Sequence, residues 1–230
     1  MVAQRAEQTG AADPPHADRT APDHSHDVYT LANIITLLRL ILVPIFFAVL
    51  ISGRNDTVSF LLFALAASTD WLDGQIARRT GTVTELGKAI DPLVDRALIG
   101  FGVLGVYLID RVPLWVLVVL LVRDLYLLGG TVYLARRRVR APAVAYIGKV
   151  TTTLLLFGFS DLILGWPMVP GLGLIDSPAL PGWGSEPAIL GIWFVYAGVI
   201  TSVATAVVYT TAALRAVSRA RAAGSSAIVE

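Results

Sequence analysis

Four aspartates lie at regular spacing near the ends of two apolar segments of the chain. Asp70 and Asp73 are three residues apart, and Asp91 and Asp95 are four residues apart. In helices, each pair would lie on one face, about one turn apart. Charged side chains at membrane depth are costly, so they usually face the interior of a helix bundle and mark a functional site. The spacing therefore predicts that two helices bring four carboxylates to one point.

Four converging carboxylates would repel one another unless some were protonated or cations were bound. Hard divalent cations relieve this repulsion, and oxygen ligands favour Mg²⁺ or Mn²⁺. Sulfur and imidazole ligands are not expected, because the chain has no cysteine and all of its histidines lie in the first 26 residues. Four acids can hold two ions when carboxylates bridge, and two ions about 3.5–4 Å apart form the clamp used in phosphoryl-group displacement.

Small residues and one arginine accompany the aspartates. Gly74 and Ala77 continue the face of the first pair, and Gly87 lies one turn before the second pair. Their small side chains would let a phosphate, a ribose or a neighbouring backbone come close, although small residues also promote helix packing in membranes. Arg78 can bind a phosphate in bidentate fashion, or it can serve as a cytoplasmic topology signal.

The elements that carry these residues are predicted to be membrane helices. The 230 residues are 55% hydrophobic and 15% charged, whereas soluble domains carry about a quarter charged residues. The net charge of +1 argues against a nucleic-acid binder. Segments of about 20 mostly apolar residues can span a bilayer as helices. Six such segments occur, at roughly 31–52, 57–77, 92–109, 113–135, 144–164 and 188–213.

The start of the third span has its own signal. Asp91 directly precedes Pro92, and proline fits the first turn of a helix. Asp91 is therefore predicted to be the N-cap of that helix.

Basic residues predict the orientation of these spans. With six spans and the N-terminus inside, interior loops and the C-terminal tail carry ten lysines and arginines, and exterior loops carry two. The fold class is thus an all-α integral membrane protein of the cell's inner or plasma membrane, with six transmembrane helices, both termini cytoplasmic and a cytoplasmic active site. Residues 1–29 are expected to form a disordered cytoplasmic tail rather than a signal peptide, 30–214 the six-helix domain, and 215–230 a cytoplasmic tail.

The aspartate motif resembles the signature of the CDP-alcohol phosphatidyltransferase family. It reads Asp70-x-x-Asp73-Gly74-x-x-Ala77-Arg78, then eight residues, then Gly87-x-x-x-Asp91-x-x-x-Asp95. Eight residues match at fixed gaps, and the six-helix architecture is similar to that of the family over residues 31–213.

The resemblance implies that an alcohol attacks the lipid-side phosphorus of CDP-diacylglycerol and releases CMP. It implies that the four aspartates bind two divalent cations and that Asp95 also deprotonates the acceptor hydroxyl. It also implies a homodimer. The residues assigned to CDP-diacylglycerol binding are Gly74, Ala77, Arg78 and Gly87 of the motif, with Asn33 and Thr36 of the first span.

Basic residues outside the motif predict an anion pocket for the acceptor. Arg39, in the first span, needs a substrate phosphate or a motif aspartate as its partner, unless it snorkels to the interface. Arg123 and Asp124 are adjacent in the fourth span, so we expect them to point in different directions and not simply to pair. Lys149 opens the fifth span, and with Arg123 it would complete the pocket.

The acceptor stays open at this point. Arg123-Asp124 and Gly148-Lys149 resemble runs in phosphatidylglycerophosphate synthase and cardiolipin synthase members of the family, but the glutamine and second lysine expected in the former are absent. Glycerol 3-phosphate and phosphatidylglycerol are both candidate acceptors, and inositol phosphate is an alternative. A divalent-cation transporter or a structural scaffold are alternatives of other classes. A transporter site would lie near the membrane midplane, whereas these aspartates lie at the cytoplasmic ends of spans.

Overall fold

The computed structural model describes the backbone over residues 31–80, 85–136 and 146–226, and side chains over most of 37–69, 96–136 and 146–218. Six helices account for most of these described residues: α1 (Leu31–Ile51), α2 (Asp56–Thr80), α3 (Glu85–Leu108), α4 (Leu114–Arg136), α5 (Tyr146–Leu164) and α6 (Gly191–Ser226). Between α5 and α6, strands β1 (Met168–Val169) and β2 (Ala188–Ile189) pair antiparallel. The tail predicted at 1–29 lies outside the described residues.

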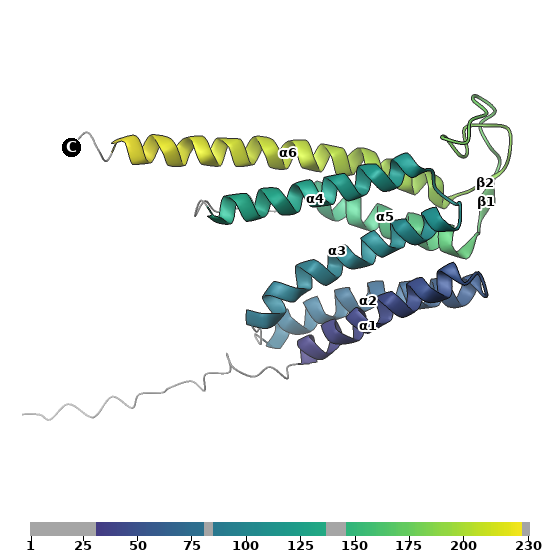
Figure 1. Cartoon of the computed structure of the whole chain (residues 1–230), viewed down its shortest axis with the longest axis horizontal. Coiled ribbons are helices and arrows are strands. Elements are labelled where there is room, and N and C mark those ends of the chain that lie inside the picture. The colour runs from purple at the N-terminus through teal and green to yellow at the C-terminus, as the bar shows by residue number, and fades with distance from the viewer. Residues whose placement is uncertain (1–30, 81–84, 137–145, 227–230) are drawn as a thin grey trace, which may run out of the picture.

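The helices alternate in direction along one long axis. In consequence α1 begins and α6 ends at the same end of the bundle, and the β1–β2 segment lies at the opposite end (Figure 1). α3 contacts α1 and α2 on one side and α4 on the other. The motif-bearing end of α2 and the start of α3 therefore share the end of the bundle at which α6 terminates.

The third helix begins earlier than its apolar run. α3 begins at Glu85, so Asp91 lies inside the helix and the prediction that it is the N-cap was wrong. The polar residues before Pro92 form a helical extension that an apolar-run search does not detect. α6 likewise continues beyond its predicted span, as far as Ser226.

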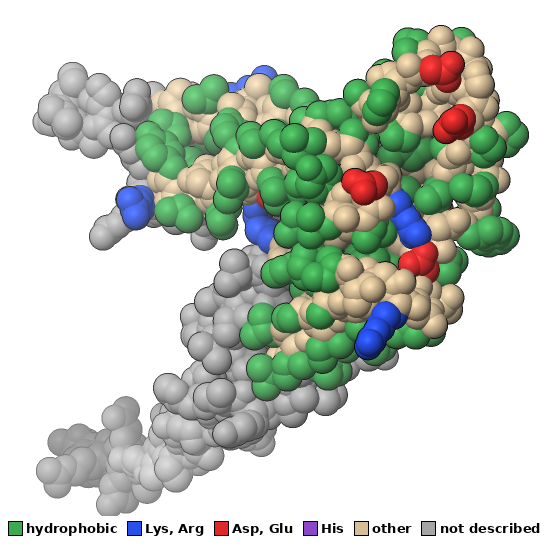
Figure 2. Space-filling view, turned by 45° about the vertical axis from the view of Figure 1, so that its right-hand side comes forward, with side chains coloured by type: hydrophobic (Ala, Val, Ile, Leu, Met, Phe, Trp, Pro, Cys, Tyr) green, Lys and Arg blue, Asp and Glu red, His purple; other side chains and the backbone are tan. Residues whose placement is uncertain are grey.

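Three of the described helices are long and apolar enough to cross a membrane: Leu114–Leu134, Tyr146–Leu164 and Gly191–Ser218. In α1, α2 and α3 the described apolar stretches are shorter, at Leu37–Ile51, Asp56–Thr69 and Arg96–Leu108. Large apolar side chains are exposed along the flanks, and Figure 2 shows hydrophobic side chains covering most of the visible face of the described helices. An exposed apolar surface of this kind is typical of a helical membrane protein. The six-span topology stays a prediction.

The tightest helix pair is α5 with α6, which approach through glycines. A Cβ on Gly158 would lie 2.8 Å from Val195 Cγ2 and 2.9 Å from the Gly191 carbonyl oxygen. A Cβ on Gly191 would clash with the Gly158 carbonyl oxygen. Small residues allow such backbone approach between membrane helices.

Replacing Gly158 with leucine is therefore expected to destabilise the fold. The added side chain would separate α5 from α6, and overpacking of this kind costs about 1–3 kcal/mol. The thermal unfolding midpoint in detergent measures the effect. Gly100→Leu is the matched control, because an added Cβ there meets nothing within 4 Å. Equal midpoints for the two variants would contradict close α5–α6 packing.

Arg111 joins three elements at the end of the bundle opposite the motif. Its Nη2 forms an ion pair with Asp56 at the start of α2, 2.5 Å away, and its Nη1 donates to the carbonyls of Leu162 and Ile163, the latter at 2.8 Å. These carbonyls belong to the last turn of α5, where the helix supplies no internal donors. The side chain thus fixes α2 and α5 to the turn between α3 and α4.

Candidate active site

The motif residues all fall on helices. Asp70 and Asp73 lie within α2, and Asp91 and Asp95 lie within α3. The helical backbone therefore places each pair about one turn apart, as the spacing required. The side chains of the motif, and those of Asn33 and Thr36 in α1, lie outside the described side chains, so the convergence of the four carboxylates stays a prediction.

Arg39 lies in the interior of the bundle beside the start of the motif. Its side chain is 0% exposed, and its Nε lies 3.5 Å from the hydroxyl oxygen of Thr69, the residue before Asp70. Thr69 in turn donates its hydroxyl to the Ala66 carbonyl. The alternative in which Arg39 snorkels to the interface is thus wrong, and a buried cation adjoins the motif helix.

Arg96 connects the motif to α4, which sequence reasoning missed. It follows Asp95 in α3, and its Nη1 donates to the backbone carbonyl of Asp124 at 2.7 Å. The middle of α4 therefore lies against α3 one residue beyond the last motif aspartate. An arginine within a membrane helix was the signal available, but nothing in the sequence identifies a backbone carbonyl as its partner.

Arg123 and Asp124 form an ion pair, contrary to the sequence-based expectation. Arg123 Nη1 lies 2.6 Å from Asp124 Oδ1, and both side chains are about four-fifths buried. Adjacent Cβ atoms diverge on a helix, but the long arginine stem lets the guanidinium turn back to its neighbour. Arg123 Nε is buried and has no hydrogen-bond partner among the described residues. One donor of this buried cation therefore stays available to an anion.

Lys149 is placed differently from the arginines. It lies in the first turn of α5 with an exposed side chain, and its backbone carbonyl accepts from Thr153. Within the described part of the chain, no hydrogen bond joins its side chain to Arg123, and it does not line the hollow that contains Arg123. The two-residue acceptor pocket is therefore not seen, and the role of Lys149 stays a prediction.

The acidic groups of the motif fit hard divalent cations in their chemistry. All four are carboxylates on regular helices, one turn apart within each pair. Oxygen ligands of this kind suit Mg²⁺ or Mn²⁺. Among the side chains that the structure describes, no group of three or more acidic or imidazole residues could hold a metal. On its chemistry, the motif is the candidate metal centre.

Charged side chains on apolar helices mark a functional site in a membrane protein, and comparison with known proteins identifies the family. A family model described as CDP-alcohol phosphatidyltransferase matches residues 29–204, and the chain belongs to this family. The chain is therefore a transferase of phospholipid synthesis. This membership removes the transporter and scaffold alternatives.

The names of individual relatives point to different products. A cardiolipin synthase (CMP-forming) of Streptomyces coelicolor is 33% identical over 167 residues, which cover 69% of this chain and 77% of the relative. A probable phosphatidylglycerophosphate synthase of Mycobacterium tuberculosis is 41% identical over 103 residues, or 43% of this chain and about half (49%) of the relative. A CDP-diacylglycerol–glycerol-3-phosphate 3-phosphatidyltransferase of Bacillus subtilis is 30% identical over 151 residues, covering 60% and 78%.

Proposed function

We propose that this protein transfers the phosphatidyl group of CDP-diacylglycerol to the hydroxyl of a glycerol-based acceptor. The acceptor is glycerol 3-phosphate, giving phosphatidylglycerophosphate, or phosphatidylglycerol, giving cardiolipin. The observation that carries the proposal is the complete family motif on α2 and α3, with buried Arg39 beside its first residue. The names of the relatives favour a glycerol-based acceptor over inositol phosphate.

The reaction assigns a role to each motif residue. Asp70, Asp73, Asp91 and Asp95 would hold two divalent cations. When bound, such cations neutralise the diphosphate and stabilise the departing CMP. Gly74, Ala77 and Gly87 leave room for the donor, and Arg78 binds its phosphate. Asn33 and Thr36 contribute to the donor site from α1.

Asp95 takes the proton from the acceptor hydroxyl while the oxygen of that hydroxyl attacks the lipid-side phosphorus. A bond forms between that oxygen and phosphorus, and the bond from phosphorus to the oxygen of CMP breaks. The buried cations Arg39 and Arg123 favour anionic substrates in this part of the bundle. Lys149, at the start of α5, is assigned to binding of the acceptor.

The proposed topology has six spans with both termini and the active site on the cytoplasmic side of the cell membrane. The alternating helices support it, because α1 begins and α6 ends at the same end of the bundle (Figure 1). The excess of basic residues that the sequence gives to the predicted interior loops and C-terminal tail agrees with the positive-inside rule. The homodimer implied by the family stays a prediction.

CMP release from CDP-diacylglycerol by the purified protein tests this function. The assay uses Mg²⁺ or Mn²⁺ in detergent, with glycerol 3-phosphate, phosphatidylglycerol, inositol phosphate, inositol and serine offered separately. We expect release with a glycerol-based acceptor and loss of release with EDTA. Two results would contradict the proposal. One is CMP release with inositol phosphate as the only productive acceptor, and the other is no CMP release with any of the five acceptors.

A further inference from the structure

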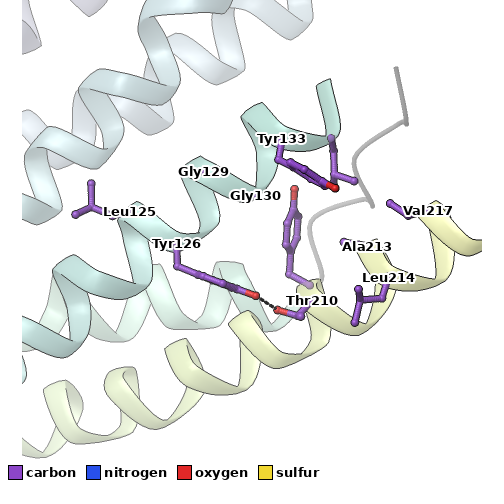
Figure 3. Close-up of a pocket in the computed structure, with 11 residues that line it drawn as sticks. Leu125, Tyr126, Gly129, Gly130, Tyr133, Thr210, Ala213, Leu214 and Val217 are labelled. Carbon is purple, nitrogen blue, oxygen red and sulfur yellow. Dashed lines mark hydrogen bonds between the residues drawn. The ribbon is translucent and has the colours of Figure 1, made fainter. Parts of the chain in front are cut away.

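A long apolar groove follows the flank of the molecule between α4 and α6. It consists of two hollows that share Tyr126 and Thr210, whose hydroxyls are 2.7 Å apart. One hollow, of about 420 Å³, includes Gly129 and Tyr133 and is drawn in Figure 3, where the Tyr126–Thr210 bond crosses from α4 to α6. The other, of about 540 Å³, includes Arg123, and we call it the Arg123 hollow.

The walls of the Arg123 hollow suit hydrocarbon. They are formed mainly by valines and an alanine, including Val118, Val122, Val203 and Val207, each between 42% and 60% exposed. Its threonine hydroxyls are used within the protein: Thr210 donates to the Ala206 carbonyl and Thr211 to the Val208 carbonyl. The threonine hydroxyls of the walls therefore need no hydrogen bonds from an occupant. Both α4 and α6 are candidate membrane spans.

One charged side chain lines this hollow, and it is a cation. Arg123 uses Nη1 for Asp124, while its buried Nε has no hydrogen-bond partner among the described residues. A guanidinium has five N–H donors and pairs readily with phosphate oxygens. An amphiphile with an anionic phosphate and a hydrocarbon chain complements this combination of surfaces.

The hollow is also close to the motif. The Asp124 carbonyl beside Arg123 accepts from Arg96, the residue that follows Asp95. α3 lies between α2, to which the donor's CDP is assigned, and α4. Displacement at phosphorus brings the nucleophile in on the side opposite the leaving group. An acceptor from the α4 side meets this requirement, whereas the donor occupies the α2 side.

We propose that the Arg123 hollow holds an acyl chain of a phospholipid acceptor, whose phosphate lies against Arg123 and whose free hydroxyl reaches Asp95. The inference rests on the proposed function and deepens it: the acceptor is a membrane lipid with a glycerol headgroup, phosphatidylglycerol, rather than water-soluble glycerol 3-phosphate. The acceptor then enters laterally from the bilayer between α4 and α6.

The acceptor's chain length is the first test. With CDP-diacylglycerol held constant, CMP release is measured with long-chain phosphatidylglycerol, dihexanoyl phosphatidylglycerol and glycerol 3-phosphate. We expect kcat/KM to be at least about 10-fold higher for the long-chain lipid than for the short-chain one. Use of glycerol 3-phosphate in preference to either lipid would overturn this inference and leave the proposed function standing. Absence of CMP release with every acceptor would instead overturn the proposed function.

Two neighbouring valines of α6 offer a matched pair of variants. Val207 lines the hollow and is 57% exposed, whereas Val208 is 43% exposed and does not line it. Val207→Trp is expected to lower kcat/KM for phosphatidylglycerol about 10-fold while leaving the KM for CDP-diacylglycerol unchanged. Val208→Trp is expected to match the unsubstituted protein. Equal loss in both variants, or a raised KM for CDP-diacylglycerol in Val207→Trp alone, would overturn the assignment to the acceptor.

Labelling of the unsubstituted protein keeps the inference testable if Val207→Trp fails to fold. Phosphatidylglycerol with a photoactivatable acyl chain is expected to label the peptides that line the hollow, which contain Val118 and Val122 of α4 and Val203 and Val207 of α6. Labelling confined to other helices would overturn the proposal. Because the chain has no cysteine, a cysteine introduced as Val122→Cys can form a disulfide only with the same residue of a second copy of the chain. Disulfide-linked pairs of that variant would assign the groove to an interface between copies instead.

Discussion

Replacing Asp95 with asparagine is expected to abolish phosphatidyl transfer while leaving the helical fold intact. The amide has the same size, but it cannot take the proton from the acceptor hydroxyl and it carries no charge for a cation. Loss of a general base alone lowers turnover by about 10²–10⁴-fold. The measurement is kcat for CMP release from CDP-diacylglycerol, with the thermal unfolding midpoint as the check on folding.

Asp161→Asn is the matched control for Asp95→Asn. Asp161 is a half-buried carboxylate in α5, near the end of the bundle opposite the motif. The same substitution there is expected to leave kcat unchanged. Unchanged turnover in Asp95→Asn would remove Asp95 as the base. A similar loss in both variants would mean that turnover depends on membrane-buried charge in general rather than on the motif.

Replacing Arg39 with methionine is expected to make the fold depend on added metal. The guanidinium is wholly buried beside Thr69, next to the first motif aspartate, and methionine keeps an apolar stem of similar length. Without this cation, the motif carboxylates repel one another more strongly in metal-free protein. With the predicted carboxylates as its partners, removing this buried cation is expected to cost about 3 kcal/mol, as for one partner of a buried ion pair, which lowers the unfolding midpoint in EDTA by roughly 6–12 °C.

The contrast between metal-free and metal-loaded protein decides the outcome for Arg39. Mg²⁺ is expected to restore much of the lost midpoint, so that the difference between Mg²⁺ and EDTA is wider than in the unsubstituted protein. Arg54→Met, at an exposed position between α1 and α2, is the control and should change neither midpoint. A decrease of the same size with Mg²⁺ and with EDTA would show that Arg39 acts through packing alone.

Apolar runs predicted where the helices lie, and the turns before α2 and α4 are short. Gly53 has a positive φ of 62° in the turn before α2, and Asp110 adopts a φ of 58° in the turn before α4. The start of α3 could not be found in this way, since its first turns are polar. Pro92 was misleading as a sign of a helix start, because α3 continues through it, just as α1 continues through Pro44 within its predicted span. Membrane helices tolerate proline where neighbouring groups satisfy the freed backbone.

The motif predicted the family correctly, but the partners of the arginines were not predictable. Arg96 and Arg111 donate to backbone carbonyls 28 and more than 50 residues away, and a carbonyl carries no signal in the sequence. Helical geometry argued against Asp124 as the partner of Arg123, and wrongly, because it fixes the direction of Cβ and not the reach of a long side chain. The close approach of α5 and α6 at Gly158 and Gly191 was not predictable either, because it depends on which helices are neighbours in the bundle.

The length of α6 has a practical consequence for imaging. At 36 residues the helix is about 54 Å long, whereas the hydrocarbon core of a bilayer is about 30 Å thick. The excess continues the helix without a break on the side where α1 begins (Figure 1). A helical fusion partner joined in register to this part of α6 would turn with the protein as one rigid body. Such a fiducial would give a small membrane protein enough asymmetric mass outside the detergent belt for electron-microscopy particles to be aligned.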